Sequence, residues 1–540
     1  MTVRRVVGLE TEYGVLAPSA PGANSTLLSA QVVNAYAATV RQGYGHLAGT
    51  RWDYADETPL SDARGWSVPR AGADPTQLTD APRELTAEQV ALAGGDARAG
   101  ETLYSEVLDE GADAAGHVLM NMVLGNGARL YVDHAHPEYS SPETTNPRDA
   151  VLWDQAGDLV TLAAARRIAE SPGFAEVLLY KNNTDNKGVS YGAHENYLMP
   201  RQTPFDDIAT GLLPFFASRQ VLCGSGRVGL GAAGRAPGYQ VSQRADFFEA
   251  EVGLETTIRR PLVNTRDEPH AVWEKYRRLH VIVGDANLGQ VSTYLRVGTT
   301  SLVLALIEAG RCPDLGLRDP VAALQSISHD PTLRAAVELS DGRRLTALDL
   351  QEGYLDAARA LCADTGADDA QTTDVLSRWQ WTIDTLRRDV AAAAGQVDWV
   401  AKLRLMEQYR DRHSLGWDDP RISLMDLQWA DIRPEKGLYH RLAARGMVET
   451  LFTPEQVAAA VGTPPEDTRA YFRGRALTAY PDDVVGASWD SLIFSVPGRP
   501  GLERVSMLEP LRGTRGLVGP LFDASLEIGE FVDRLRSGTR

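Results

Sequence analysis

The residues from 126 to 139 hold the densest group of chemically active side chains in the sequence. The first half of this segment alternates in polarity as a half-buried strand does, which predicts Arg129, Tyr131 and Asp133 on one face. A single strand of this kind is better explained as a solvated face. Three more segments with the same pattern favour a polar site built on the rigid floor of a sheet.

Carboxylates recur close to this predicted strand. Pro137 is expected to break the strand ladder, and Glu138, in the turn that follows, to return a second carboxylate to the floor. In the strand predicted at Val6–Val15, Glu10 and Glu12 share one face. Paired acids on a strand repel each other unless a cation lies between them, so this pattern indicates a metal ion or a metal bound to phosphate.

Two later strands contribute imidazoles. Val189–Leu198 is predicted to place His194 and Asn196 on one face, and Arg278–Val283 is predicted to present His280 beside Ile282. Each histidine alone is better explained as a structural residue. Together with the carboxylates they predict a hard-cation site, for which magnesium or manganese fits better than zinc because oxygen donors dominate and no thiolate is near.

These segments follow one another in an order that resembles a known family. The ordered motifs are Gly8–Gly14, Asn126–Tyr139, Tyr191–Tyr197, Asn264–His270 and Arg277–Asp285, followed by Ala487–Ser491 and Leu508–Thr514. With them the chain closely resembles the Pup ligases and Pup deamidases/depupylases of actinobacteria over nearly its whole length. That family is similar in fold to glutamine synthetase and glutamate–cysteine ligase, so the resemblance implies a curved, largely antiparallel sheet with carboxylates on its concave face.

Two features favour the deamidase/depupylase branch over the ligases. The ligases carry one more residue between the aspartate and the glutamate of the motif that here reads Asp133 to Glu138. The segment Arg51–Gly65 resembles a stretch of the depupylases that the ligases lack. It opens an insertion of about residues 51–116, whose later part is rich in Ala, Gly, Asp and Pro and receives no assigned role.

The resemblance implies an ATP-dependent hydrolase that deamidates the C-terminal glutamine of Pup and cleaves Pup–lysine isopeptide bonds. ATP and Mg²⁺ would be bound cofactors. Asp133 matches the catalytic aspartate of the family, either as the nucleophile or as the base that activates water. The alternatives are a Pup ligase that runs the opposite reaction and a binding protein without catalysis. The presence of Asp133, Glu10 and Glu138 speaks against the binding protein.

The resemblance also implies roles for the surrounding polar residues. Arg129 should hold a phosphate of ATP. Positions matching metal ligands of the family are Glu10, Tyr131 and Glu138, with His194 and His280 for a second metal, and positions matching nucleotide contacts are Ser141 and Trp489. Arg266 is a candidate for binding phosphate or a product carboxylate, and a salt bridge to Asp267 or Glu268 is an equal alternative.

Composition places limits on partners and location. The chain has 540 residues and a formal charge of −18, which argues against a nucleic-acid partner. Three widely spaced cysteines indicate a reducing compartment, and the start of the sequence shows no targeting leader, so we expect a cytoplasmic protein. No segment is long and apolar enough to predict a membrane span.

The resemblance implies Pup and pupylated proteins as partners, with a functional link to the proteasome. Because Pup is itself acidic, its groove would need a local basic strip despite the overall negative field. The candidates for that strip are Arg259, Arg260, Arg277 and Arg278. An ordinary charged surface would explain these four arginines equally well.

The order of predicted elements indicates an α+β protein. Strand patterns dominate up to about residue 300, with helices predicted at Val151–Glu170 and Ser301–Gly310. The pattern then becomes helical, most clearly at Val375–Ala394 and Val397–Tyr409. We expect a catalytic domain at residues 1–469 and a small C-terminal domain at residues 470–540.

Two short motifs point to other classes of protein. Gly224–Gly229 fits the dinucleotide pattern, but the glycine-rich sequence after it cannot start a helix, so it is interpreted as a flexible loop. Gly188–Gly192 fits the nucleophile elbow of serine hydrolases with Ser190 as nucleophile. That elbow requires a helix directly after the serine, whereas the sequence here alternates like a strand, so a serine hydrolase is the weaker alternative.

Overall fold

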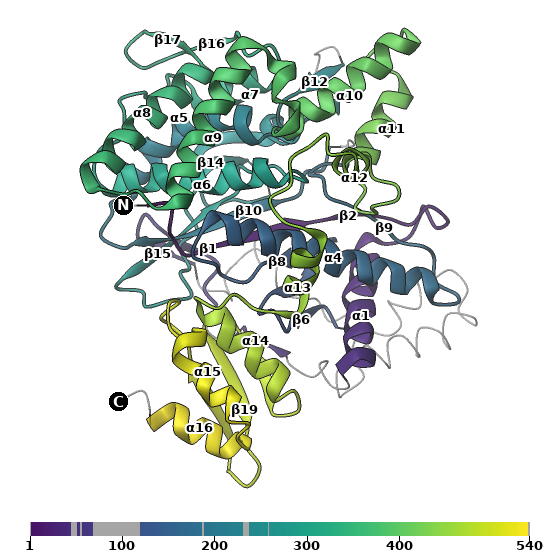
Figure 1. Cartoon of the computed structure of the whole chain (residues 1–540), viewed down its shortest axis with the longest axis vertical. Helices are drawn as coiled ribbons and strands as arrows, with labels where there is room; N and C mark the ends of the chain where they lie inside the picture. The colour runs from purple at the N-terminus through teal and green to yellow at the C-terminus, as the bar shows by residue number, and fades with distance from the viewer. Residues whose placement is uncertain are drawn as a thin grey trace.

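The computed structural model describes residues 2–44, 51–54, 57–68, 119–185, 188–229, 237–257 and 259–537. Figure 1 shows a central sheet with a large group of helices above it and a smaller unit, coloured yellow, below it. Most of the insertion expected at residues 51–116 lies outside the described residues. In the part of the chain that is described, no helix is long and apolar enough to cross a membrane.

The central sheet has six strands, and every neighbouring pair is antiparallel. In order across the sheet they are β15 (Tyr276–Val281), β10 (Ala193–Pro200), β1 (Val7–Glu12), β8 (His136–Ser140), β7 (Arg129–Asp133) and β6 (Asn121–Val123). This arrangement confirms the predicted α+β class with a large antiparallel sheet. Smaller pairs flank it: β2 (Gly14–Leu16) with β9 (Leu178–Tyr180), β4 (Ser61–Asp62) with β5 (Trp66–Ser67), β11 (Arg227–Gly229) with β12 (Gly238–Gln240), β13 (Phe248–Gly253) with β14 (Arg260–Asn264), and β16 (Ala336–Glu338) with β17 (Arg344–Thr346).

Residues 126–139 form a hairpin, which corrects the expectation that Pro137 ends the strand. The turn consists of His134, with φ 51°, and Ala135, and Pro137 lies inside β8 opposite Val132. The amide of Val132 donates to Met120 O, away from β8, so the missing N–H of Pro137 costs no hydrogen bond in this pair.

Helices cover the back of the sheet. α1 (Ser25–Tyr44) and α4 (Pro147–Glu170) pack against β1, β7 and β8, where Tyr139 lies flat under Gly157 of α4. A Cβ at Gly157 would fall 2.3 Å from the ring of Tyr139, so only glycine permits this approach. α5 (Phe205–Cys223) and α6 (Gln290–Glu308) cover the same face further along and pair Arg219 and Arg296 with Glu195 of β10.

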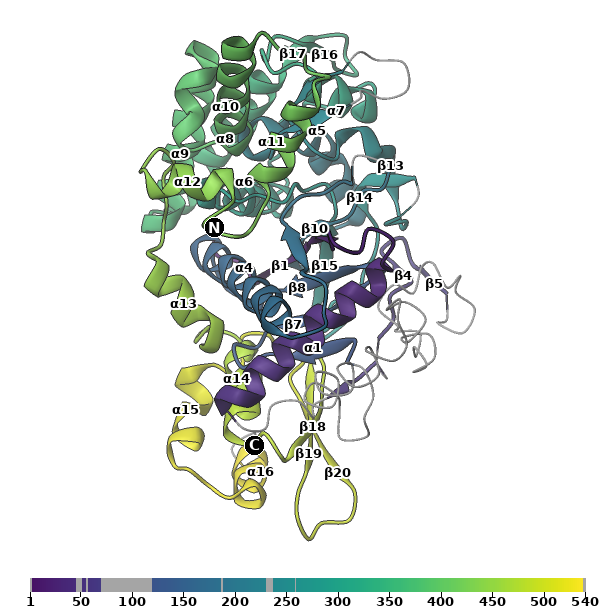
Figure 2. The same ribbon diagram turned by 90° about the vertical axis from the view of Figure 1, so that its right-hand side faces the viewer.

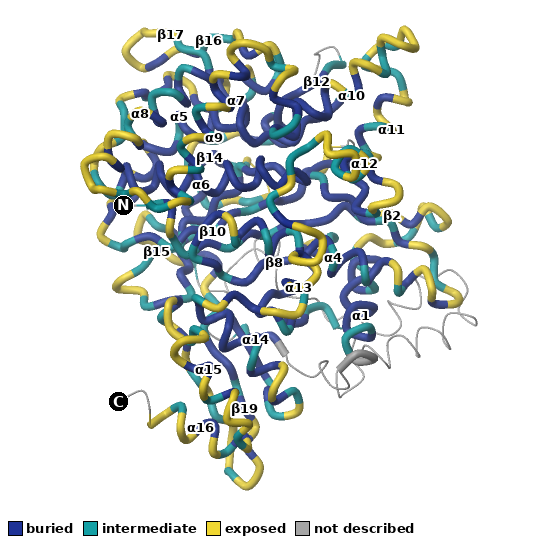
Figure 3. Tube along the Cα trace, viewed as in Figure 1, coloured by how far each residue is buried: buried dark blue, intermediate teal, exposed yellow. Residues whose placement is uncertain are grey.

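The helices that follow β15 form the upper part of the molecule, where the largest cluster of buried side chains lies (Figure 3). They are α7 (Pro320–Ser328), α8 (Ala347–Thr365), α9 (Ala370–Arg388), α10 (Asp398–His413), α11 (Pro420–Trp429) and α12 (Leu438–Ala444), while α13 (Pro454–Gly462) lies lower and packs against α4. The helix predicted at Val375–Ala394 ends earlier, because Asp389 caps a separate 3₁₀ turn, Val390–Gly395. The run Ser301–Gly310 is the end of α6, which begins at Gln290.

The last part of the chain forms the unit below the sheet, seen from the side in Figure 2. It contains α14 (Arg469–Ala479), β18 (Val484–Ala487), β19 (Ser491–Ser495), β20 (Leu502–Ser506), α15 (Arg515–Asp523) and α16 (Ile528–Ser537). A strand from far earlier, β3 (Arg51–Trp52), pairs with β18. We propose residues 470–540 as a small C-terminal domain, supported by a buried cluster of its own that also takes in Trp52 and Val123.

The dinucleotide pattern does not build a nucleotide fold. Gly224 follows the end of α5, and Arg227–Gly229 is strand β11 of a hairpin, so helix, loop and strand occur in the reverse of the required order. The loop interpretation is therefore wrong for Arg227–Gly229 and holds for Gly224–Gly226.

Candidate active site

The front face of the sheet is polar because the strand registers bring the alternate, polar residues of neighbouring strands next to one another. Glu10 of β1 lies opposite His194 of β10. Glu12 of β1 lies opposite Glu138 of β8, which in turn lies opposite Tyr131 of β7. The expectation that Glu10, Tyr131, Glu138 and His194 converge on one face is confirmed.

One cluster on this face combines a carboxylate with two imidazoles. Ligand atoms of Glu10, His194 and His280 lie within 4.8 Å of one another. His194 Nδ1 lies 3.2 Å from Glu10, and Asn196 Nδ2 donates to the other oxygen of Glu10 at 2.8 Å. His280 Nδ1 lies 2.9 Å from Asn196 Oδ1, so the amide orients both the carboxylate and a ring.

A second cluster lies beside it and consists of carboxylates alone. Ligand oxygens of Glu12, Asp133 and Glu138 lie within 4.8 Å of one another, and all three residues are buried. The hydroxyl of Tyr131 donates to Glu138 Oε1 at 2.6 Å, while Glu138 Oε2 is buried without a hydrogen-bond partner among the described residues. Glu12 accepts from the amide of Gly192 at 2.6 Å.

The charges of these groups are unevenly balanced. Burial together with the carboxylates of Asp133, Glu10 and Glu12 raises the pKa of Glu138 well above its usual range. Burial also acts to raise the pKa of Glu10, but the hydrogen bond from His194 and the nearby imidazole and Arg278 charges outweigh it and hold that pKa far below its ordinary value.

The pKa of His280 is lowered well below its ordinary value, chiefly by burial, so its ring is neutral and free to act as a ligand. The acidic cluster has two imidazoles beside it, His134 at Asp133 and His136 at Glu12. Both clusters offer carboxylate or imidazole donors that suit a divalent cation.

Asp133 stands at the end of β7, where the hairpin turns. His134 Nδ1 lies 2.9 Å from Asp133 Oδ1. Oδ1 is buried and accepts no hydrogen bond among the described residues, so the contact with His134 is an ion pair when that ring is protonated. Burial alone would lower the pKa of His134, but the contact with Asp133 and the charge of Glu12 raise it.

Arg129 lies in the same face, enclosed by aromatic rings. Its guanidinium carbon lies 3.9 Å from the ring centres of both Trp52 and Tyr131, and its Nε donates to Asn121 Oδ1 at 3.0 Å. A guanidinium held flat between two rings is presented edge-on, which suits an oxyanion such as a phosphate.

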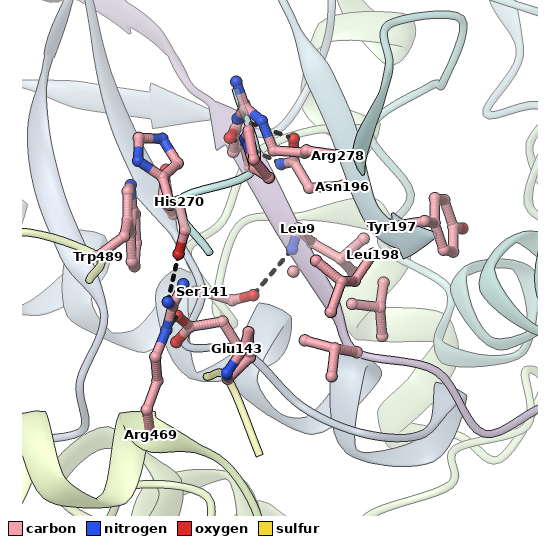
Figure 4. A pocket seen from close by; sticks show the side chains of 17 residues that line it. Leu9, Ser141, Glu143, Asn196, Tyr197, Leu198, His270, Arg278, Arg469 and Trp489 are labelled. Atoms are coloured by element: carbon pink, nitrogen blue, oxygen red, sulfur yellow. Dashed lines mark hydrogen bonds and ion pairs between the residues drawn. The ribbon is translucent and has the colours of Figure 1, made fainter. Parts of the chain in front are cut away.

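A cavity opens at the Glu10 end of the face (Figure 4). Ser141 and Trp489, the two residues expected to contact a nucleotide, both line it. Figure 4 shows Trp489 beside His270 on one wall and Arg278 with Asn196 on another. Arg469 of the C-terminal unit completes the wall through hydrogen bonds to Glu143 and to His270 O.

The other arginines that were singled out in the sequence have different surroundings in the structure. Arg266 makes no ion pair with Asp267 or Glu268 in the described chain. Asp267 pairs instead with Arg201 and Arg277. The Nε of Arg266 is buried without a hydrogen-bond partner among the described residues. The expected basic strip does not form. Arg277 is turned to Asp267, Arg278 faces the cavity, and Arg259 is exposed.

Sequence reasoning missed part of the site. The pair Glu10 and Glu12 indicates a metal, but only Glu10 is among the positions matched to metal ligands, although the spacing of two residues that puts Glu12 on the same face was signal enough. Asn196 carried the same kind of signal. His134 carried none, because its place beside Asp133 depends on the two-residue turn.

Ser190 is not placed as a nucleophile. It forms a single bridge with Thr184 and is followed by strand β10 rather than by a helix. Its hydroxyl oxygen accepts a hydrogen bond from Arg244 Nε at 3.3 Å. The serine hydrolase alternative is therefore not supported.

Comparisons with known proteins agree with this geometry. A family model described as Pup-ligase protein matches residues 5–493. The chain is similar to the depupylase of Acidothermus cellulolyticus, with 53% identity over 99% of this chain and 100% of the relative, and to the Pup deamidase/depupylase of Mycobacterium tuberculosis, with 50% identity over 100% of both.

Two solved structures of a related ligase are also similar. The complex between the prokaryotic ubiquitin-like protein Pup and its ligase PafA aligns with a TM-score of 0.73 and 29% identity, over 99% of this chain and 95% of that one. The Pup ligase PafA in complex with ADP aligns with a TM-score of 0.68 and 35% identity, over 75% and 90%.

Proposed function

The chain belongs to the Pup ligase and Pup deamidase/depupylase family, and from this premise we propose that it is a hydrolase of Pup amide and isopeptide bonds. It deamidates the C-terminal glutamine of Pup and releases Pup from lysine side chains of pupylated proteins. The observation that carries the proposal is the carboxylate of Asp133 within a buried acidic cluster, where its Oδ1 accepts no hydrogen bond among the described residues, in a chain whose full-length relatives are depupylases.

We propose ATP and Mg²⁺ as its cofactors. Two groups of residues would hold divalent ions: Glu10 with His194 and His280, and Glu12 with Glu138, assisted by Tyr131. Ser141, Trp489 and Arg129 would contact the nucleotide, and Arg266 is a weaker candidate for a phosphate. A bound divalent ion would supply positive charge that stabilises the oxyanion formed when the amide carbonyl is attacked.

The chain's own residues account for the remaining steps. Asp133 either attacks the glutamyl carbonyl carbon or removes a proton from the water that does so. If Asp133 attacks, the carbon–nitrogen bond breaks to leave a mixed anhydride between Asp133 and the glutamyl carbonyl, which water then hydrolyses; if Asp133 is the base, water adds to the carbonyl directly. In both routes one water is consumed, and its protons end on the leaving nitrogen and its oxygen on the glutamate product, so that ammonia or a lysine amine is released. The buried surroundings of Glu12, Asp133 and Glu138 keep bulk water from the reacting carbonyl.

The opposite reaction, ligation of Pup to lysine, is the second candidate. Relatives named Pup–protein ligase match only about two thirds of this chain, whereas the depupylases match all of it. The spacing from Asp133 to Glu138 favours the hydrolase as well. We also propose a functional link to the proteasome and a cytoplasmic location.

The test is incubation of the purified protein with ATP, Mg²⁺ and a Pup–lysine conjugate. We expect release of the free target protein without stoichiometric formation of ADP. New conjugates formed together with an equal amount of ADP would show a ligase instead. A matched reaction without nucleotide tests the cofactor role of ATP, since turnover should then be lost.

A further inference from the structure

The turn that follows Asp133 is held from behind by the first residues of helix α1. The hydroxyl of Ser29 donates to Ala135 O at 2.9 Å. The hydroxyl of Thr26 donates to His134 O at 3.3 Å. These two carbonyls belong to the two residues that join β7 to β8, and α1 runs beside both strands and packs against them (Figure 2).

This turn has little support of its own. The ladder of the hairpin ends with the pair Asp133 and His136, so the two residues between them lie outside it. No backbone amide of the described chain donates to the carbonyl of His134 or of Ala135. His134 also has a φ of 51°, in the left-handed region that residues with a side chain disfavour. Such a conformation persists only where its surroundings hold it.

Ser29 differs from an ordinary helical serine because its hydroxyl has a second acceptor outside the helix. It donates to Ser25 O at 2.8 Å, one helical turn earlier, as well as to Ala135 O. Ser301 of α6 has the usual arrangement, in which the hydroxyl donates to the carbonyl four residues earlier, here Val297 O at 2.9 Å. Ser29 is 0% exposed, so bulk water is not at hand to replace its hydroxyl.

The place of the Asp133 carboxylate depends on this backbone. Asp133 is the last residue of β7, directly before the turn. Its Oδ1 accepts no hydrogen bond among the described residues, so no donor fixes that oxygen. Attack on a carbonyl, or removal of a proton from a water, requires close alignment, and a displacement of about 1 Å can lower a rate by ~10²-fold.

We propose that Ser29 is a positioning residue for the reaction, whose hydroxyl fixes the turn after β7 and thereby the carboxylate of Asp133. Thr26 assists through its longer contact with the same turn. The inference rests on the proposed function, because it takes Asp133 as the group that acts on the amide carbonyl. Ser29 acts from the covered back of the sheet and does not touch the substrate.

The experiment measures ammonia release from Pup with a C-terminal glutamine for the unmodified enzyme, Ser29→Ala, Thr26→Val and Ser301→Ala. The kcat, the KM, the affinity for nucleotide and the melting temperature are determined for each protein. We expect Ser29→Ala to lower kcat roughly 10-fold and Thr26→Val ~3-fold, with KM and nucleotide affinity within about twofold of the unmodified enzyme. Ser301→Ala is the matched control, since it removes a buried helical hydroxyl remote from the turn and should keep kcat within about twofold.

Three results would overturn the positioning role. They are a kcat of Ser29→Ala within about twofold of the unmodified enzyme, parallel changes in kcat, KM and nucleotide affinity, and a loss of kcat that Ser301→Ala shares. If Ser29→Ala fails to fold, the half-buried Thr26 decides, and an unchanged kcat in Thr26→Val would then exclude a role for α1 in placing Asp133. Absence of ammonia release by the unmodified enzyme would overturn the proposed function, whereas normal release with insensitive variants would overturn this inference alone.

Discussion

At the scale of single residues, the main feature of the site is a group of three carboxylates that lie so close together that their negative charges repel one another. Ligand oxygens of Glu12, Asp133 and Glu138 lie within 4.8 Å of one another, and burial together with the neighbouring carboxylates raises the pKa of Glu138 well above its usual range, which favours its protonated form. Binding of a divalent cation should therefore release a proton from this cluster.

Glu12→Gln tests this cluster directly. The amide keeps the shape of Glu12 and can still accept from Gly192 N–H, so we expect an intact fold. Mg²⁺ affinity, measured by titration in the presence of nucleotide, should fall roughly 10-fold or more because one anionic ligand is lost. Glu170→Gln, an exposed change of the same charge in α4, serves as the control, and equal affinities in the two variants would exclude Glu12 as a ligand.

Asp133→Asn tests the catalytic assignment. The amide can neither attack the carbonyl nor take a proton, so turnover should fall by ~10²-fold or more. Nucleotide and Pup affinities, measured by calorimetry, should stay near those of the unmodified enzyme because Asp133 lies beyond the cavity. A variant that keeps more than about a hundredth of the rate would show that another group does the chemistry.

Residue types and alternation were enough to predict most of this site. Period-two alternation identified Glu10, Tyr131, Asp133 and His194 as one face, because the pleat of a strand fixes that relation locally. Glu138 was correctly predicted to lie on the polar face, but the reason given, a turn after Pro137, was wrong. A proline interrupts a strand pair only where its nitrogen, which carries no hydrogen, faces the neighbouring strand. Which way the nitrogen of Pro137 faces is decided by pairing partners that are remote in sequence.

At the scale of elements, strand β1, which carries Glu10 and Glu12, is fixed by a buried polar network on its back. Lys181 is 1% exposed and lies 2.8 Å from Asp154 and 3.1 Å from Asp158, both on α4. Thr11 and Tyr13, which follow Glu10 and Glu12 along the chain, donate to Asp154 and Asp158. The network therefore ties strand β1 to its supporting helix.

Lys181→Met should destabilise the fold by roughly 3–5 kcal/mol, because two buried carboxylates lose their cation. The deficit should depend on pH. The pKa of Asp158 is raised to about 6, so its folded form already binds a proton more tightly than the unfolded chain. Without Lys181 that preference grows, and the loss of stability should be larger at pH 8 than at pH 5, where the acids can take up protons.

Chemical denaturation at the two pH values measures this difference. Lys275→Met removes an exposed lysine paired with Glu509 and should change stability by less than about 1 kcal/mol at either pH. A deficit in Lys181→Met that does not grow with pH would show that its acids are compensated elsewhere. No sequence pattern signalled this network, since it joins three elements through residues that look ordinary one at a time.

At the scale of the whole molecule, the cavity is built by two units that are distant in sequence. Glu143, just after β8, pairs with Arg469 and Arg473 of α14. Trp489 and Arg469 of the C-terminal unit close a cavity whose floor is β1. The motif around Trp489 could be recognised from the sequence, but the ion pairs that hold its unit against the sheet could not, because nothing local specifies them.

Glu143→Gln should lower both the stability of the protein and its affinity for nucleotide, because Glu143 joins the C-terminal unit to the sheet. The two arginine charges lower the pKa of Glu143 to about 2, against the rise that burial alone would cause. A depressed carboxyl pKa contributes stability that is present above the unfolded value of 4.5 and is lost as pH falls from there through about 2. The variant should therefore be less stable at pH 7 by roughly 3 kcal/mol, and the gap to the unmodified protein should narrow below pH 4.5.

Thermal denaturation between pH 7 and pH 3.5 and nucleotide titration at pH 7 check both parts. Glu466→Gln is the matched control, because Glu466 pairs with Arg515 in the same region but both side chains are exposed, so it should change stability by less than about 1 kcal/mol and leave nucleotide affinity unchanged. A loss of stability in Glu143→Gln without a loss of nucleotide affinity would mean that Glu143 holds the two units together but does not orient Arg469. Loss of both would show that Glu143, which lines the cavity and pairs with Arg469 and Arg473, is needed both for the stability of the junction and for nucleotide binding.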